Sequence, residues 1–353
     1  MIQDLVLPEN FISSEKLSKF SNIVFAENIN KDFYTPSADL IVVDELEDEL
    51  HKSITYKSSH LNLRSGSIVF SHTDFVEELF FLLNKEKKLT NITLISSQSD
   101  KVISNKLYNK KPSSVTKWFA VNNSIMNDFV KNIPLGLGNS FSKKNVTSED
   151  IPPLNRIFYQ KNKISLYLNF NVNTNYKERS SLYENFRNKD WCYISTSNNR
   201  EDYIRSLRSN AFILCPSGNG PDTHRMWESL YFGSIPIIKK HRCFEGYQDL
   251  PILYVDSFNE VNKDLLSKFM DNLDIEKINL EKLDVRYWKK KFTENIILTT
   301  KSEDYSLTFS SIELFFFSIK KRFNLMKIKL KKRATSMFHK FKKLNNLIKK
   351  SIL

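Results

Sequence analysis

Residues 211–240 read AFILCPSGNGPDTHRMWESLYFGSIPIIKK, and this stretch decides the fold. It opens with an apolar run that predicts a buried strand, which breaks at the Pro- and Gly-containing turn 216–221. Asp222 or Thr223 can cap a helix that follows, and Gly233 is suited to end it. A second apolar run then predicts another strand. This order of strand, helix and strand is typical of a parallel β-α-β unit.

The helix expected after Thr223 has two chemically different faces. At 100° per residue, the apolar face carries Met226, Trp227, Leu230 and Tyr231, and the polar face carries His224, Arg225 and Glu228. The polar side chains lie in the first turn and a half, where backbone N–H groups lack intrahelical partners and the helix dipole is positive. Because glycines at 218 and 220 let the backbone approach closely, we predict a phosphate site here. The carboxylate of Glu228 is placed to accept hydrogen bonds from ribose hydroxyls.

A simpler interpretation is a glycine turn that leads into an ordinary capped helix with a solvated polar face. The loop is not a Walker loop, because no Gly-Lys-Ser/Thr follows the glycines. An α/β enzyme with another nucleotide cofactor is a further alternative, which the absence of a Gly-x-Gly-x-x-Gly turn weakens.

The rest of the chain predicts two α/β units. In the first unit we expect strands at 38–43, 67–70 and 91–95, a helix at 74–83, and later elements at 118–119 and 133–137. In the second unit we expect strands at 164–168, 191–194, 211–214 and 235–238, and helices at 177–186 and 201–208. Pro152 and Pro153 interrupt the periodicity within 141–157, which indicates a boundary there. Two doubly wound units place a cleft between them, and ligands bind at the carboxyl ends of parallel strands.

The run 215–238 closely resembles the signature of exostosin-like (family 47 type) glycosyltransferases, especially their bacterial relatives. Weaker similarity to the same group occurs at 166–175 with Glu178 and Arg179, and at 115–122 followed by 133–137. The resemblance implies an α/β fold of GT-B type, in which two Rossmann-like domains face a cleft. We therefore expect an acceptor-side Rossmann-like domain at 1–150, a nucleotide-sugar-binding Rossmann-like domain at 151–300, and an amphipathic polybasic helical tail at 301–353.

The resemblance also implies the activity. We expect a hexosyl- or pentosyltransferase of polysaccharide biosynthesis, which moves a sugar from a UDP-linked nucleotide-sugar donor to a glycan or lipid-linked glycan acceptor. The nucleotide-sugar is a co-substrate, so no cofactor is expected. By motif position Glu228 holds the ribose, and Arg225 with the 218–220 loop holds the diphosphate. Arg179 is either a second phosphate cation or a surface arginine in a Glu-Arg pair. The expected donor site consists of Arg179, Ser217, Gly218, Asn219, Gly220, Asp222, Thr223, His224, Arg225 and Glu228.

The catalytic groups are less sharply defined by the sequence. No Asp-x-Asp follows a strand, and the acidic run 44–48 suits a solvated turn, so we expect a metal-independent enzyme that uses a helix N-terminus and arginines against the diphosphate charge. The residues after the strand 67–70 include His72 and Asp74, and either can take the acceptor proton. Asp74 as a simple cap of a helix beginning at Phe75 is the competing interpretation. Inversion at the sugar carbon is what the resemblance implies.

The positive charge is concentrated near the C-terminus. The chain has a net charge of +13, and 319–353 contain thirteen basic and no acidic residues, which leaves 40 of each sign elsewhere. Lysines alternate there with apolar residues at spacings of three and four, which predicts an amphipathic helix bound to an anionic membrane surface. Packing against the body and disorder are the alternatives. A balanced body argues against a specific nucleic-acid partner. A non-enzymatic membrane- or nucleic-acid-binding adaptor that acts through the tail is the alternative function.

Composition and cysteine usage indicate the compartment. With 41% hydrophobic residues the chain can bury substantial cores. Cys192, Cys215 and Cys243 lack zinc-like spacing, and we expect buried thiols in a reducing compartment. The first residues show no signal-peptide pattern, and no stretch reaches the roughly 18–20 apolar residues that cross a bilayer. We therefore expect a cytoplasmic protein that is peripheral on the cytoplasmic face of the membrane.

Overall fold

A computed structural model gives the fold of this chain. It describes residues 5–26, 28–30, 41–47, 52–57, 60–140, 142–161, 163–196, 199–294 and 303–317, together with Ile319, Phe323 and Met326. The chain forms two compact units, Met1–Leu307 and Thr308–Leu353.

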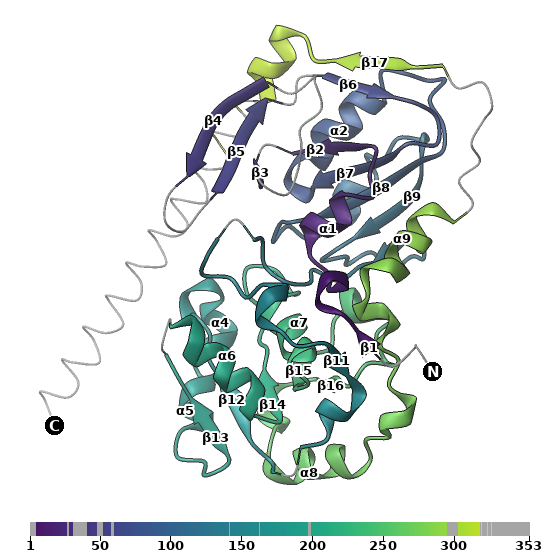
Figure 1. Cartoon of the computed structure of the whole chain (residues 1–353). Coiled ribbons are helices and arrows are strands. Elements are labelled where there is room, and N and C mark those ends of the chain that lie inside the picture. Colours follow the sequence, from purple (N-terminus) through teal and green to yellow (C-terminus); the bar gives the residue numbers. More distant parts are fainter. Residues whose placement is uncertain are drawn as a thin grey trace, which may run out of the picture. The chain divides into compact units, whose positions relative to one another are not determined.

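The first sheet of the larger unit is a five-stranded parallel sheet (Figure 1). In spatial order its strands are β10 (Val130–Asn132), β9 (Val115–Ala120), β8 (Ile92–Ser97), β7 (Ile68–His72) and β2 (Ile23–Phe25). All six residues of β8 are buried, as expected for a parallel strand covered on both faces. Its helical segments are α1 (Ser14–Ser18), η2 (Thr73–Phe75), α2 (Val76–Leu83) and α3 (Asn105–Tyr108). The strands expected at 67–70 and 91–95 are confirmed, and the helix expected at 74–83 begins with the short η2 turn.

The strand expected at 38–43 lies in a separate sheet from the strands at 67–70 and 91–95. Its described part begins β4 (Ile41–Glu47), which pairs antiparallel with β5 (Lys52–Lys57) in a separate sheet that also contains β3 (Asn28–Asn30). The acidic run expected as a turn at 44–48 therefore lies largely within β4. The strand beside β7 at the edge of the first sheet is β2.

The second sheet is also five-stranded and parallel. In spatial order its strands are β13 (Cys192–Ile194), β12 (Leu166–Leu168), β14 (Phe212–Leu214), β15 (Ile235–Lys239) and β16 (Leu253–Val255). Numbered from β12, this order is 2-1-3-4-5, so the direction of strand addition reverses between β12 and β14. In open α/β sheets such a reversal creates the crevice in which ligands bind. The first sheet adds its strands in sequence order and has no such reversal among its described strands.

The helices of the second sheet confirm two predictions and alter a third. They are α4 (Tyr176–Arg179), α5 (Leu182–Phe186), α6 (Arg200–Ser209), α7 (His224–Tyr231), α8 (Lys263–Asp271) and α9 (Val285–Thr293). The helices expected at 201–208 and after Thr223 are present as α6 and α7. The single helix expected at 177–186 is divided into α4 and α5, with two serines at the break, Ser180 and Ser181.

Short elements complete the larger unit. The short strands are β1 (Leu5–Val6), β6 (His60–Leu63), β11 (Leu154–Asn155) and β17 (Tyr305–Thr308), of which β1 pairs with β11 and β6 with β17. The 3-10 turns are η1 (Pro8–Asn10), η3 (Ser148–Asp150), η4 (Arg156–Tyr159), η5 (Val172–Thr174), η6 (Arg242–Phe244), η7 (Phe258–Glu260), η8 (Ile275–Lys277) and η9 (Leu280–Leu283).

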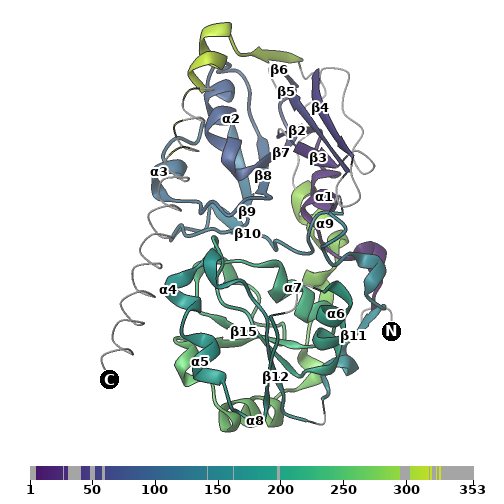
Figure 2. The ribbon, with the colours of Figure 1, turned by 90° about the vertical axis from the view of Figure 1, so that its left-hand side faces the viewer.

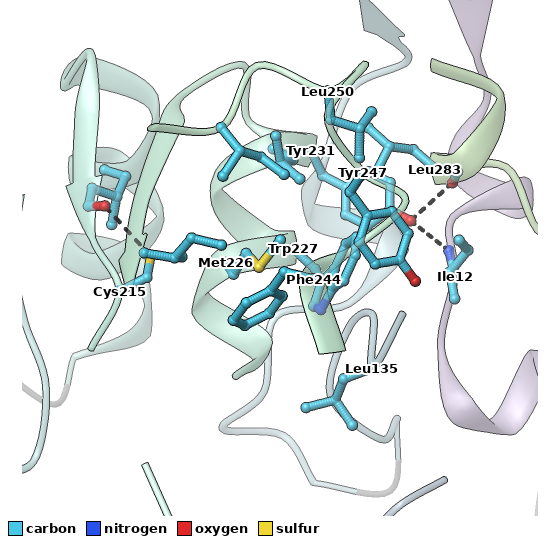
Figure 3. Packing of buried hydrophobic residues seen from close by; sticks show 14 of the residues in the cluster. Ile12, Leu135, Cys215, Met226, Trp227, Tyr231, Phe244, Tyr247, Leu250 and Leu283 are labelled. Atoms are coloured by element: carbon cyan, nitrogen blue, oxygen red, sulfur yellow. Dashed lines mark hydrogen bonds between the residues drawn. The ribbon is translucent and has the colours of Figure 1, made fainter. Parts of the chain in front are cut away.

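Two segments connect the sheet regions within the larger unit. The N-terminal segment packs on α7, where the Phe11 and Tyr231 ring centroids are 4.3 Å apart. The Tyr231 hydroxyl accepts the Ile12 N–H at 2.8 Å and donates to the Leu283 carbonyl at 2.9 Å (Figure 3). The second connecting segment is α9. It follows the second sheet in the chain, but it lies beside α1 of the first sheet region in both ribbon views (Figure 1 and Figure 2). The domain limits at 150 and 300 stay predictions, since both sheets belong to one unit.

The described part of the smaller unit begins with Thr308, the last residue of β17, and continues with helical positions. Residues 311–317 are helical, and so are 319, 323 and 326. Ile312 is 80% exposed and Phe316 is 69% exposed. Most of the tail predicted at 319–353 lies outside the described residues. Among the residues that are described, no helix is long and apolar enough to span a bilayer.

Candidate functional site

The helix α7 begins and ends where the sequence indicates. Thr223 is its N-cap, with extended φ and ψ of −136° and 144°, although its side chain makes no capping hydrogen bond. Gly233 follows the helix with a φ of +68°, the left-handed conformation expected there. The four residues of the predicted apolar face are fully buried. Because these four side chains pack into the core, they fix the rotation of α7 about its axis and therefore the direction in which its polar face points.

The Arg179 side chain reaches from the segment after β12 to the loop after β14, the two strands between which the strand order reverses. Its side chain is 4% exposed, so it is not the surface arginine of the competing interpretation. The guanidinium donates to the carbonyls of Ser217, Pro216 and Asn171, each at 2.8 Å. Glu178 accepts the Ser217 N–H at 2.8 Å. This pair, which follows β12, therefore fixes the loop that follows β14.

Arg225 lies in the first turn of α7 and has a hydrogen-bonding group left over. Its Nε is buried, and in the described part of the chain no acceptor is within hydrogen-bonding range of that atom. Burial, with a smaller contribution from the positive charge of Arg225, lowers the pKa of Arg179 to about 10. Burial acts to lower the pKa of Arg225 too, but Tyr203, Cys215 and Glu228 outweigh it and raise the pKa. Arg225 is therefore a permanent cation with an unused donor.

Glu228 lies one turn after His224 on the same helix and is 7% exposed. Its Oε2 accepts the Tyr203 hydroxyl at 2.6 Å. Burial and the nearby Glu228 raise the pKa of Tyr203, so this phenol remains a donor at neutral pH. Tyr203 comes from α6, and the sequence motif gave no spacing by which it could be found.

Asp222 faces the interior rather than the polar face of α7. Its carboxylate accepts the Trp227 Nε1–H at 2.8 Å and the Leu135 N–H at 3.1 Å. Burial raises its pKa to about 7. Asp222 thus connects the start of α7 to the segment after β10. A direct contact of Asp222 with the nucleotide-sugar donor stays a prediction.

The loop 217–222 lies against the carboxyl end of the first sheet. The Asn219 Nδ2 donates to Asp100 at 3.0 Å, and the Asp222 N–H donates to the Asn122 side chain at 2.9 Å. A Cβ added at Gly220 would lie 2.9 Å from Asn122 Nδ2, so this contact requires glycine.

Within the loop itself, the Gly218 N–H donates to the Gly220 carbonyl at 2.9 Å. The N–H groups of Ser217, Gly218 and Asp222 are therefore all used within the protein. We therefore expect a bound anion to accept its hydrogen bonds mainly from the backbone N–H groups in the first turn of α7.

His224 contacts the first-sheet region directly. Its Nδ1 is 2.7 Å from the Gly136 carbonyl, which fixes the proton on Nδ1 whenever the ring is neutral, because a carbonyl can only accept. Gly136 has a φ of +72°, and a Cβ there would lie 2.4 Å from the Ile12 carbonyl oxygen. This contact places His224 beside the first sheet region.

The two predicted bases lie at the carboxyl end of β7. His72 ends that strand, and burial lowers its pKa to about 4 against the raising effects of Gln98 and Asp74. Its Nε2 is buried and has no hydrogen-bond partner among the described residues. Asp74 is exposed within η2, and no side chain caps η2 or α2, so the interpretation of Asp74 as a helix cap is wrong. In the described part of the chain no hydrogen bond joins either residue to α7. Their role as the catalytic base stays a prediction.

Several other site features concern metals, thiols and cavities. Within the described ranges, no group of three or more His, Cys, Asp or Glu side chains is placed to hold a metal ion. Cys215 and Cys243 are buried free thiols, whereas Cys192 is partly exposed. The cavities lined by Trp118 and Trp288, by Leu253 and Phe269, by Val6 and Leu280, and by Phe158 and Phe232 do not include Arg225, Glu228 or the 217–223 loop.

Sequence comparison connects the second sheet region to known proteins. The family described as RXYLT1 C-terminal domain matches residues 161–299, which include β12 to α9 and the whole of α7. A probable glucuronosyltransferase of Oryza sativa subsp. japonica is 40% identical over 60 residues, and the probable glucuronosyltransferase GUT1 of the same organism is 38% identical over 60 residues. Each alignment covers 17% of this chain and only 14% of the relative.

Structural comparison finds a similar chain in the crystal structure of AviGT4, a glycosyltransferase involved in avilamycin A biosynthesis. The match has a TM-score of 0.33 at 10% sequence identity and covers 67% of this chain and 85% of the other. The sequence matches, of which the family match covers residues 161–299, support a relationship to an exostosin-like glycosyltransferase family.

Proposed function

We propose that the chain is a glycosyltransferase that moves a sugar from a UDP-linked donor to a glycan or lipid-linked glycan acceptor, in a GT-B arrangement of two Rossmann-like domains. The observation that carries this proposal is Arg225, a buried cation whose Nε has no acceptor among the described residues. It lies at the N-terminus of α7, next to the reversal of strand order. An anionic ligand at this crevice gives the unused donor its partner.

A diphosphate suits the charges around Arg225. A buried donor without a partner costs about 1–3 kcal/mol, and a hydrogen bond to a phosphate oxygen removes that cost. The first-turn N–H groups of α7 add their dipole to the same anion. In this proposal Arg179 acts mainly by holding the loop, because its N–H groups already bond Ser217, Pro216 and Asn171.

Glu228 suits the ribose of the donor. Its carboxylate lies one helical turn deeper than His224 on the polar face, and Tyr203 occupies one of its oxygens. Ribose hydroxyls donate to carboxylates, and this pairing is a common way to recognise a nucleoside. The ordering from Arg225 to Glu228 therefore follows the ordering from diphosphate to ribose along a nucleotide.

The proposed reaction is a direct displacement. The acceptor hydroxyl oxygen forms a bond to the anomeric carbon as the bond between that carbon and the diphosphate oxygen breaks, so the configuration inverts. The acceptor proton passes to His72 or Asp74, and the nucleoside diphosphate leaves with the bonding electrons. Its charge is met by Arg225 and the start of α7, without a metal ion. Preorganised groups of this kind stabilise a transition state by a few kcal/mol each.

A thermal-shift panel of sugar nucleotides tests the donor assignment. Wild-type protein should be stabilised by one donor, since ligand at 100 times its dissociation constant adds about 2.7 kcal/mol. Glu228→Ala and Arg225→Gln should remove that stabilisation. Glu184→Gln, which alters an exposed carboxylate paired with Arg187, should leave it intact. A full donor shift in Glu228→Ala refutes the ribose assignment.

We also propose that the second unit binds the anionic cytoplasmic face of a membrane. Ile312, Phe316 and Ile319 are spaced by four and three residues on the helical stretch and are all exposed, at 80%, 69% and 45%. That spacing places them on one helix face. The thirteen basic residues of 319–353 supply electrostatic attraction of up to roughly 1 kcal/mol each. This arrangement suits a lipid-linked acceptor at the same surface.

Vesicle sedimentation tests the membrane proposal. The full chain should pellet with vesicles of phosphatidylserine and phosphatidylcholine and not with phosphatidylcholine alone. The double variant Ile312→Asp with Phe316→Asp should pellet several-fold less, because it removes apolar anchors and keeps all thirteen basic residues. Equal pelleting of variant and wild type contradicts the proposal. Membrane binding without any donor shift favours the adaptor alternative.

A further inference from the structure

The first residue of α7 has a ring nitrogen that no described residue uses. The His224 Nδ1 is 2.7 Å from the Gly136 carbonyl, so a neutral ring carries its proton on Nδ1 and has a lone pair on Nε2. This Nε2 makes no hydrogen bond within the described part of the chain, and it is not buried, in contrast to the buried Nε2 of His72. His224 therefore presents an open hydrogen-bond acceptor at the start of the helix.

The carbonyl that sets this tautomer is held in place by the backbone around it. Gly136 has a φ of +72°, and the N–H of the next residue, Leu137, donates to the Ile12 carbonyl at 2.8 Å. No larger residue fits at 136, since a Cβ there would lie 2.4 Å from the Ile12 carbonyl oxygen. Because Nδ1 bonds to a fixed carbonyl, the direction of the His224 Nε2 is fixed as well.

Two further open groups lie on the same polar face of α7. The Nε of Arg225 is buried without a described acceptor, while its two Nη atoms are not buried and make no hydrogen bond to a described residue. The Oε2 of Glu228 accepts the Tyr203 hydroxyl, whereas its Oε1 is not buried and has no described partner. An acceptor at His224, donors at Arg225 and an acceptor at Glu228 therefore occupy about 6 Å of helix length.

The lone pair on Nε2 selects the kind of ligand group that can bind there. It accepts a hydrogen bond, and an ionised phosphate has no proton to donate, whereas a sugar hydroxyl has one. In a nucleotide-sugar the diphosphate lies between the ribose and the sugar that is transferred. If Glu228 binds the ribose and Arg225 the diphosphate, the transferred sugar is the part of the donor that His224 can contact.

We infer that the His224 Nε2 accepts a hydrogen bond from a hydroxyl of the transferred sugar and so contributes to the choice of donor sugar. The inference rests on the proposed function for the nature of the donor. The contact makes and breaks no covalent bond, and it leaves transfer of the acceptor proton to His72 or Asp74 as proposed. One hydrogen bond of this kind is expected to change affinity about threefold to tenfold.

Isothermal titration calorimetry with UDP and with UDP-sugars tests the inference, at about pH 8, where imidazoles are generally neutral. The panel contains UDP-glucose, UDP-galactose, UDP-xylose, UDP-N-acetylglucosamine and UDP-glucuronic acid. In His224→Asn the amide N–H can replace Nδ1 at the Gly136 carbonyl, but no acceptor remains at the position of Nε2. This variant should weaken the best-bound UDP-sugar about threefold to tenfold and leave the affinity for UDP within about twofold. Arg225→Gln should weaken both compounds alike, because both contain the diphosphate.

His224→Phe separates the sugar contact from the structural contact with Gly136. It lacks both nitrogens, so it should melt below wild type and lose affinity for the UDP-sugar as His224→Asn does, whereas His224→Asn should melt close to wild type. The inference is overturned if His224→Asn binds the UDP-sugar as tightly as wild type, or if it weakens UDP by the same factor. Binding of UDP without binding of any UDP-sugar overturns it too. A wild-type protein that binds none of these compounds refutes the proposed function, and the inference with it.

Discussion

Three buried tyrosines provide a graded test of the packing around α7, because their hydroxyls differ only in the number of partners. Tyr231 bonds two backbone groups, the Ile12 N–H and the Leu283 carbonyl. Tyr159 bonds one, the Leu230 carbonyl at 2.7 Å. Tyr247 bonds none among the described residues. All three rings are at most 1% exposed, so the change from tyrosine to phenylalanine removes the same atom from the same kind of environment.

The expected losses follow from the partners that each substitution leaves behind. A buried backbone group that loses its partner costs about 1–3 kcal/mol. Tyr231→Phe leaves two such groups and should destabilise the fold by about 2–5 kcal/mol. Tyr159→Phe should cost about 1 kcal/mol, since the Leu230 carbonyl still accepts the Gly233 N–H at 3.0 Å. Tyr247→Phe should be neutral or stabilising by up to about 1 kcal/mol, because it removes a donor that was never satisfied.

Thermal unfolding followed by circular dichroism at 222 nm measures the series, with ligand-free protein at one concentration. In a unit of this size 1 kcal/mol corresponds to a shift of about 2 °C, so Tyr231→Phe should melt about 4–10 °C below wild type. Tyr247→Phe should melt at or above the wild-type temperature. A Tyr247→Phe variant that loses as much stability as Tyr231→Phe would refute the assignment of an unpartnered hydroxyl.

Other perturbations have equally definite signs. Gly233→Ala should cost more than 2 kcal/mol in urea unfolding, since its φ is +68° and the new Cβ would lie 2.4 Å from the Phe158 Cβ; Gly246→Ala, at φ +97° with open space around it, should cost about half as much. Burial raises the pKa of Asp222 to about 7 from an ordinary value near 4, so its stabilising contribution is complete at low pH and is lost as pH rises through 7; the unfolding free energy of Asp222→Asn should fall less than wild type between pH 5 and 8. Burial lowers the pKa of His72 to about 4 from about 6.5, so its contribution to stability is present above pH 6.5 and is lost as the pH falls through 4. The unfolding free energy of His72→Gln should therefore fall less than that of wild type between pH 6.5 and 4.

The residues that the sequence predicted well are those whose structure depends on near neighbours. The apolar spacing of α7, the glycine at its end and the apolar runs of β14 and β15 are all local patterns, and the structure has each of them. The same is true of β7 and β8. Local patterns are sufficient here because the strands are short apolar runs buried on both faces and α7 carries its apolar residues at helical spacing.

The features that the sequence missed depend on distant contacts. Tyr203 reaches Glu228 from another helix, and Asp222 is turned inward by Leu135, 87 residues away along the chain. The N-terminal segment before α1 gave no pattern, yet Phe11 and Ile12 are fully buried against α7 and its surroundings. No spacing rule connects such positions, because the contact is created by the order of strands in the sheet.

Strand order also explains why Glu178 and Arg179 act on the loop near Ser217. These residues follow β12 and the loop follows β14, and the two strands are neighbours only because β13 was placed on the far side of β12. In open α/β sheets the connections leave such a reversal in different directions, and ligands bind at the carboxyl ends of the two strands. The first turn of α7 begins at the same edge, and its buried apolar face fixes the helix, which leaves the Arg225 Nε without an acceptor among the described residues. A helix whose other face was loosely packed could turn to satisfy that donor. The buried side of α7 is therefore part of the proposed anion site, and substitutions in it should weaken donor binding even where they touch no ligand.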